Sequence, residues 1–173
     1  MALQKKVWNF LVNMQEWIMV FTSLSLAIMV TIAVCLRYIF KLDLYGIEEI
    51  EILVAMWLYF IGASYGSYTR SQISADVVEA LVPESKIKQY MRCIRSLLAV
   101  VLYAGLLYLA VDLLMFNVAS NFKTAIWKIP TYFTSAGILL GCSLMTLYGL
   151  VEMKEIFHET FFLKKDNFVK ADG

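Results

Sequence analysis

The sequence predicts an all-α membrane protein with four transmembrane helices and both termini in the cytoplasm. Of its 173 residues, 61% are hydrophobic and 17% are charged, against about 45–50% and about a quarter in soluble domains. The charged residues are nearly absent from four long runs, and the basic residues concentrate in alternate connections. Intrinsic disorder needs low hydrophobicity and high charge, so it is excluded. Residues 1–173 are expected to form a single membrane domain.

The four apolar runs predict the four helices. Residues 17–36, 52–69 and 129–151 contain no charged residue, and residues 96–122 contain only Asp112. Each run is about as long as the roughly 17–25 residues that cross a bilayer as a helix. Only helices and closed barrels satisfy their backbone in lipid, and these runs lack the alternation of barrel strands. We expect helices over about 17–37, 50–69, 95–116 and 130–151.

The first run is predicted to be a retained helix rather than a cleaved signal peptide. An amphipathic segment precedes it, and Cys35-Leu36-Arg37 is no small-residue cleavage site. Residues 3–14 place apolar side chains on one helical face, which indicates either an interfacial helix or an extension of the first spanning helix. Residues 72–94 are also amphipathic and predict interfacial helices in the connection between the second and third spans.

The basic residues set the predicted orientation, because cytoplasmic connections are enriched in Lys and Arg. One side holds Lys5, Lys6, Arg70, Lys86, Lys88, Arg92, Arg95, Lys154, Lys164, Lys165 and Lys170. The other side holds Arg37, Lys41, Lys123 and Lys128. Both termini are therefore expected inside. The net charge of +1 offers no case for binding nucleic acid.

Charged residues near the helix ends and small residues within the helices are the candidate contact residues. Glu48 and Glu49 open the second helix, where acidic side chains favour the positive end of the helix dipole. Gly62 and Gly66, like the pair Gly137 and Gly141, form a small-xxx-small pattern that allows close helix packing. The pattern suits internal packing or a partner, and we favour internal packing. Pro130 is expected to open the fourth helix.

Asp112 is the one charge inside an apolar run. An intramembrane carboxylate is by default a candidate functional residue, here for a cation or proton. However, it lies about 24 Å along the helix from Ser96, at about 1.5 Å per residue. That distance favours a position near the outer headgroups, and Asn117 and Asn121 follow it.

The chain offers little catalytic chemistry. Its only histidine is His158, whereas bis-histidine haem ligation needs two. Cys35, Cys93 and Cys142 are far apart, and no Cys-x-x-Cys, metal-ligand spacing or phosphate-binding glycine pattern is present. We expect no cofactor, no metal and no enzyme activity, which favours a subunit that supports another protein.

A set of residues between 37 and 83 carries a family resemblance. It comprises Arg37-Tyr38-x-Phe40, Glu48-Glu49, Trp57, Gly62-Ala63, Arg70, Ile73, Asp76 and Leu81-x-Pro83, followed later by Ile129-Pro130-x-Tyr132. This pattern resembles the small membrane subunit of tripartite ATP-independent periplasmic (TRAP) transporters, the DctQ family. The sequence departs from the family pattern at Ile47 and Gln72 and lacks a proline early in the fourth helix.

The resemblance implies a role in transport across the bacterial inner membrane. TRAP systems import organic acid anions, such as sialic acids or C4-dicarboxylates, with a sodium gradient. A periplasmic binding protein captures the substrate, and a large membrane subunit moves it as an elevator. The small subunit then packs against the static scaffold of the large subunit, and its outer loops help to dock the binding protein.

The resemblance also suggests roles for named residues, with intramolecular structure at least as probable as partner contact for each. Glu48 and Glu49, with Arg37 as a partner, orient the first two helices or contact the large subunit. Trp57, Gly62 and Gly66 supply packing surface, while Arg70 and Asp76 order the start of the inner connection.

Three alternatives stay open at this point. A small four-helix multidrug exporter needs a carboxylate in its first helix, and residues 17–36 contain none. A haem- or quinone-linked anchor is disfavoured by the single histidine and the scattered cysteines. The third alternative is a membrane scaffold or anchor subunit of another complex.

Overall fold

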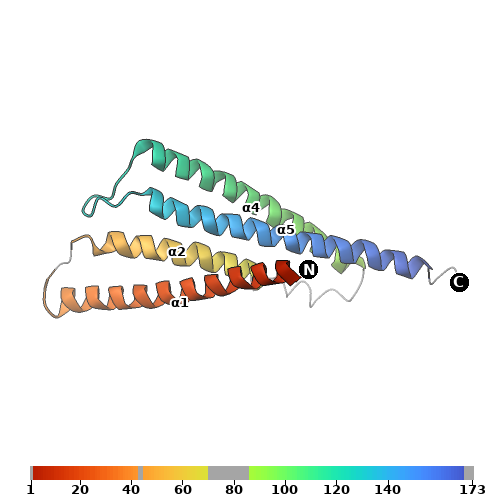
Figure 1. Cartoon of the computed structure of the whole chain (residues 1–173), viewed down its shortest axis with the longest axis horizontal. Coiled ribbons are helices and arrows are strands. Elements are labelled where there is room, and N and C mark those ends of the chain that lie inside the picture. Colours follow the sequence, from red (N-terminus) through yellow and green to blue (C-terminus); the bar gives the residue numbers. More distant parts are fainter. Residues whose placement is uncertain (1, 43–44, 70–85, 170–173) are drawn as a thin grey trace.

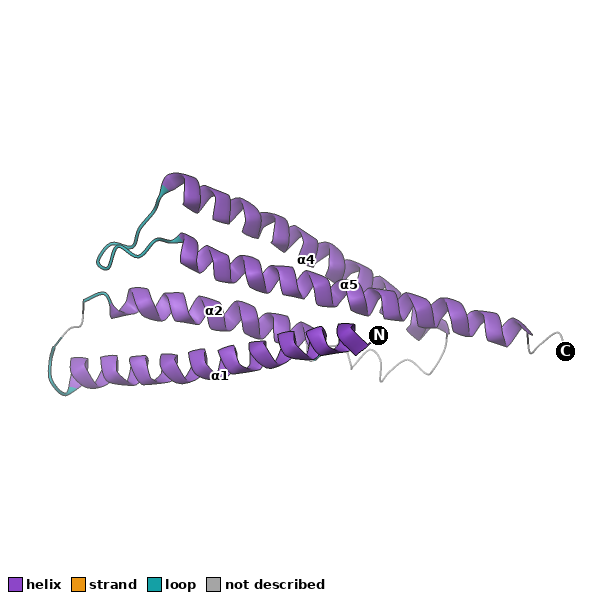
Figure 2. Cartoon of the chain, viewed as in Figure 1, coloured by secondary structure: helices purple, strands orange, loops and turns teal. Residues whose placement is uncertain are grey.

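The structure, a computed structural model, describes residues 2–42, 45–69 and 86–169 (Figure 1). Its helices are α1 (Ala2–Tyr38), α2 (Ile47–Tyr68), α4 (Lys86–Ser120) and α5 (Tyr132–Val169). The described part of the chain contains no strand, only an isolated bridge between Lys123 and Pro130 (Figure 2). The predicted all-α class is confirmed.

The helices lie side by side in a single row in the order α1, α2, α5, α4 (Figure 1). The main contacts join α1 to α2, α2 to α5, and α5 to α4. Helices α2 and α5 are therefore central, while α1 and α4 form the two edges. The connections that follow α1 and α4 lie at the same end of the layer, measured along the helix axes, and we name it the loop end. The first residues of α1 lie towards the opposite end of the helix axes.

All four helices match the predicted segments, but three of them run well beyond the apolar stretches. Helix α1 is continuous from Ala2, so residues 3–14 extend the first spanning helix and form no separate helix. Residues 86–94 likewise belong to α4, and the rest of the predicted amphipathic segment 72–94 falls outside the described residues. No Gly or Pro interrupts these flanks, so helix formation propagates through them.

Three of the described helices are long and apolar enough to cross a membrane. The candidate spans are Phe10–Tyr38, Tyr90–Ser120 and Tyr132–His158. Helix α2, with 22 residues, is the shortest of the four and carries glutamates in its first turns and serines and tyrosines in its last turns. That composition suits its central place, where α1 and α5 cover it from two sides. A fourth crossing by α2 stays a prediction.

The interior of the row is small. Ala110, Cys142 and Met145 form its buried apolar cluster, with Phe60 and Tyr103 packed against it. Many large apolar side chains are instead exposed from Phe10 to Tyr38 in α1 and from Tyr90 to Val118 in α4. Such a surface is far too apolar for water and is what a membrane-embedded chain presents to lipid and to other subunits.

Candidate functional site

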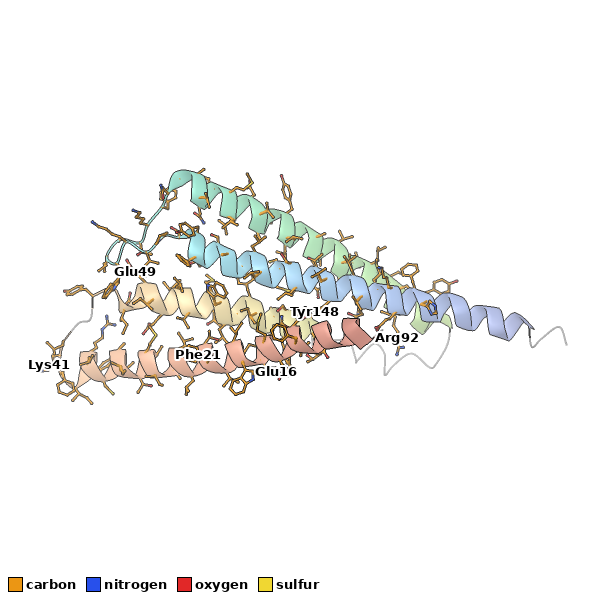
Figure 3. All side chains as sticks on the ribbon, in the orientation of Figure 1. Glu16, Phe21, Lys41, Glu49, Arg92 and Tyr148 are labelled. Atoms are coloured by element: carbon orange, nitrogen blue, oxygen red, sulfur yellow. The ribbon has the colours of Figure 1, made fainter. Side chains whose placement is uncertain are left out.

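Glu49 in the first turn of α2 binds the connection between α4 and α5 at the loop end. The backbone N–H of Ile126 donates to its Oε1 at 2.9 Å, and that of Trp127 donates to Oε2 at 3.0 Å (Figure 3). The connection is a short hairpin closed by the Lys123–Pro130 bridge, with Lys128 at a φ of 52°. One carboxylate therefore holds together segments far apart in the sequence.

Gly46 provides the close approach that this contact requires. It is buried, its φ is 91°, and a Cβ on it would lie 2.5 Å from Nε1 of Trp127. An L-residue with a side chain rarely adopts that φ. The indole ring of Trp127 therefore packs over the start of α2, while the backbone N–H of Trp127 donates to Glu49.

The hydrogen bonds lower the pKa of the Glu49 carboxyl below its ordinary value of 4.5. The N–H of Trp127 has the largest effect, and the N–H of Ile126 and the Thr124 hydroxyl add to it, while desolvation opposes them. A depressed pKa means that the ionised form stabilises the folded loop end at neutral pH. This stabilisation is lost as the pH falls below 4.5 and through the lowered pKa.

Replacing Glu49 is expected to loosen the hairpin at residues 121–131. Glu49→Ala should speed amide hydrogen exchange at Ile126 and Trp127 several-fold, since charge-assisted hydrogen bonds are about twice as strong as neutral ones. Glu49→Gln keeps an acceptor without the charge, so its exchange rates at Ile126 and Trp127 should lie between those of the unaltered chain and those of Glu49→Ala. Exchange measured at pH 7 and at a pH below the lowered pKa of Glu49 should show that acid removes the difference in protection between the unaltered chain and Glu49→Gln. Glu48→Gln is the matched control, and equal protection in Glu49→Ala and the unaltered chain contradicts the assignment.

The expected pairing of Arg37 involves Glu48 rather than Glu49. Nη2 of Arg37 lies 3.7 Å from Oε1 of Glu48, and both side chains are more than half exposed. An exposed ion pair at that distance stabilises little. The two glutamates could not be distinguished from the sequence. In the structure, successive side chains point to different sides of the helix, so Glu49 faces the hairpin and Glu48 lies beside the end of α1.

Small residues and Trp57 form the contact between α2 and α5. Nε1 of Trp57 donates to the carbonyl of Phe133 at 3.2 Å, and its ring lies over Gly137. A Cβ on Gly141 would lie 2.6 Å from the backbone oxygen of Phe60. The glycine pair of α5 therefore packs internally, against α2.

The glycines of α2 lie in looser surroundings. A Cβ on Gly62 would meet only Sδ of Met19 in α1, at 3.8 Å, which is ordinary contact. Gly66 is half-buried, and its carbonyl accepts a hydrogen bond from the Thr69 hydroxyl. Pro130 lies two residues before the first residue of α5, just outside the helix that it was expected to open, and its carbonyl accepts the N–H of Phe133.

A buried hydrogen-bond chain, which the sequence did not single out, joins three helices towards the end opposite the loops. Gln15 of α1 donates through Nε2 to Oγ of Ser64 in α2 at 2.8 Å. The hydroxyl of Tyr148 in α5 donates to Oε1 of Gln15 at 2.8 Å (Figure 3). Gln15 and Ser64 are almost fully buried. Beside them Tyr65 donates to Glu16 at 2.7 Å, so at this end of the helices α1 is held to α2 by two hydrogen bonds.

A second missed pair joins α4 to α5 near the loop end, where Nδ2 of Asn117 donates to Oγ of Ser135 at 2.6 Å. The available signal was a polar side chain inside or beside an apolar run. Several serines and asparagines satisfy that description, and only the helix register selects the pairs.

The remaining predicted residues do not join a common site. Asp112 is exposed on α4. Arg70 and Asp76 lie outside the described residues. Within residues 2–42, 45–69 and 86–169, no group of His, Cys, Asp and Glu side chains is arranged to hold a metal ion. Four of the described buried polar side chains, Gln15, Ser64, Asn117 and Ser135, form hydrogen bonds across helices, which is an arrangement for assembly. Oε1 of Glu51 is buried without a hydrogen-bond partner among the described residues.

Comparison with known proteins places the chain in a family. A search of curated proteins found no match. The family model for the DctQ component of tripartite ATP-independent periplasmic transporters matches residues 26–159. That match includes most of the row of helices, the Glu49-bound hairpin and the contact between α2 and α5. The chain therefore belongs to the DctQ family, the small membrane components of TRAP transporters.

Proposed function

We propose that this chain is the non-catalytic small subunit of a sodium-coupled TRAP transporter that imports an organic acid anion of the sialic acid or C4-dicarboxylate type. Family membership supports the transporter class. It also removes the grounds for a multidrug exporter or a haem anchor, which the sequence already disfavoured. The substrate and sodium sites belong, in this proposal, to the large membrane subunit.

The observation that carries the proposal is the single row of helices. A self-sufficient bundle closes its helices around one interior, but here α1 and α4 each have one main neighbour. Large apolar side chains are exposed along both edges, including Leu24 at 60% and Leu102 at 66%. A flat layer of this kind suits a subunit that packs against the static scaffold of the large subunit and enlarges its membrane anchorage.

The loop end is the part of the chain that suits contact with the periplasmic binding protein. Glu49 holds the hairpin in place, and Lys123, Lys128 and the ring of Trp127 are exposed there. A held loop loses less conformational entropy when a partner binds. In this proposal the loop end is periplasmic, α2 forms the fourth crossing, and both termini are cytoplasmic, as the basic residues predict.

Co-expression tests the proposal. A tagged chain should co-purify in equal amounts with the large membrane subunit of its own system. Proteoliposomes containing both subunits and the binding protein should take up the anion only with an inward sodium gradient. Omission of this chain should abolish uptake. Full uptake by the large subunit alone would contradict the supporting role, and a compartment-sensitive reporter found outside at either terminus would contradict the orientation.

A further inference from the structure

Asp112 lies on the face of α4 that points away from the rest of the chain. The face of α4 packed on α5 includes Ala110 and Asn117, which are buried. Asp112 is two residues from Ala110, or about 200° around the helix. It is exposed, and no described residue hydrogen-bonds or forms an ion pair with it. The described part of the chain therefore leaves this carboxylate open to whatever lies beside α4.

The contacts between helices locate Asp112 along the row. Asn117 is level with Ser135, to which it is hydrogen-bonded, and Ala110 packs beside Cys142. Asp112 lies between those two contacts and nearer to the second. It is therefore level with the middle of the charge-free residues 129–151 in α5.

The same level lies at the middle of α2. Gly141, next to Cys142, touches the backbone of Phe60, and Phe60 is central in the charge-free residues 52–69. Two neighbouring runs thus agree that Asp112 lies near mid-depth. Counting from Ser96 favoured the outer headgroups, because the third run is longer than the others and its inner end extends past theirs.

A carboxylate exposed to lipid at mid-depth is costly, and such residues normally face protein or a water-filled space. Gly105 marks the same face, because it precedes Asp112 by two helical turns and differs from it by only about 20° around the axis. A Cβ on Gly105 would meet no other described part of the chain within 4 Å. Glycine is unfavourable in a helix unless a close neighbour uses the space.

The outward face of α1 differs. Val20 and Leu24 are 61% and 60% exposed, about as much as Leu109 at 61%, but residues 17–36 carry no charge. That face is compatible with lipid as it stands. Both edges of the row thus expose large apolar side chains, and of the apolar runs 17–36 and 96–122 only the run in α4 contains a charged group, which lipid disfavours.

Resting on the proposed function, we infer that the α4 face bearing Gly105 and Asp112 docks a transmembrane helix of the large subunit. That helix crosses closely at Gly105 and presents a basic side chain to Asp112, while the α1 edge faces lipid. A metal-ion site is not favoured, because no metal-binding group of side chains lies among the described residues and cations such as Ca²⁺ take six or more oxygen ligands.

Photocrosslinking in the complete complex tests which edge docks. A photoreactive phenylalanine analogue at Leu109 or Met115, which are 61% and 67% exposed beside Asp112, should crosslink the large subunit. The same analogue at Val20 or Leu24 is the matched control and should label lipid. Crosslinks to the large subunit from α1 but not from α4 would overturn the inference and leave the proposed function intact. Failure of the unaltered chain to co-purify would overturn both.

Charge substitution tests the pairing. Asp112→Lys should lower the amount of co-purified large subunit about tenfold or more, since separating a buried charge from its partner is expensive. Asp112→Leu should lower it less, because it adds no repulsion. Neither should change the unfolding midpoint of the isolated chain. Unchanged complex yield in Asp112→Lys would overturn the pairing, as would Asp112→Asn that assembles fully but transports nothing, which would indicate an ion or proton site.

Discussion

A single added methyl group at Gly141 is expected to destabilise the isolated chain by about 1–3 kcal/mol. The Cβ of Gly141→Ala would lie 2.6 Å from both Cβ and the carbonyl oxygen of Phe60, so α2 and α5 must move apart. A flexible side-chain tip would yield at little cost, but Phe60 contributes its backbone here. Separation also strains the nearby contact of Trp57 with Gly137.

The control substitution for Gly141→Ala is expected to have the opposite effect on stability. Gly105→Ala meets no other part of the chain within 4 Å, so the alanine should stabilise α4 by up to about 1 kcal/mol through helix propensity. Gly62→Ala, which meets only Met19 at 3.8 Å, should be close to neutral or stabilising. Unfolding midpoints of the three variants, measured in one detergent, check the order. Equal midpoints for Gly141→Ala and Gly105→Ala would contradict the close approach of α2 to α5.

The second large effect is expected at Gln15. Gln15→Leu removes the one side chain that binds both Ser64 and Tyr148, and it leaves the Tyr148 hydroxyl without that acceptor. The expected cost is about 1–2 kcal/mol, the range for buried hydrogen bonds in membrane proteins and for unsatisfied polar groups. Tyr148→Phe should cost less, because it removes a donor and leaves Gln15 with Ser64.

A double-mutant cycle between Gln15→Leu and Tyr148→Phe measures their coupling, expected at about 0.5–1.5 kcal/mol. Thr31→Val is the control, since the exposed Thr31 hydroxyl bonds only the carbonyl of Ala27 in its own helix. Its effect should stay within about 0.5 kcal/mol. Strict additivity of the two substitutions would show that the hydrogen bond between α1 and α5 does not form.

The two effects concern different requirements of the same row. Gly141 allows the central helices to touch, which matters because lipid supplies little hydrophobic drive between helices. Gln15 and Tyr148 then select the register in which α1 joins them, since a buried polar group without a partner is costly. Packing alone would leave α1 free to slide along α2, because apolar side chains impose no particular depth.

The sequence by itself determined the all-α class, the positions of the apolar helices, the lack of a recognisable catalytic motif and the resemblance to DctQ that the family match confirms. These properties depend on local hydrophobicity, charge distribution and short motifs, which can be identified before any contact is known. The same information did not predict the helix boundaries correctly, because a helix continues past its apolar run until a residue breaks it.

Only the tertiary structure decided which polar residues meet. Glu48 and Glu49 are adjacent and alike in the sequence, yet one pairs weakly with Arg37 and the other holds the hairpin at Ile126 and Trp127. The structure also decides which residues of α5 and α2 lie level with Asp112, because that depends on the stagger between neighbouring helices and not on distance along its own helix. Rotation and stagger arise from side chains that fit across interfaces, so they emerge only when the helices pack together.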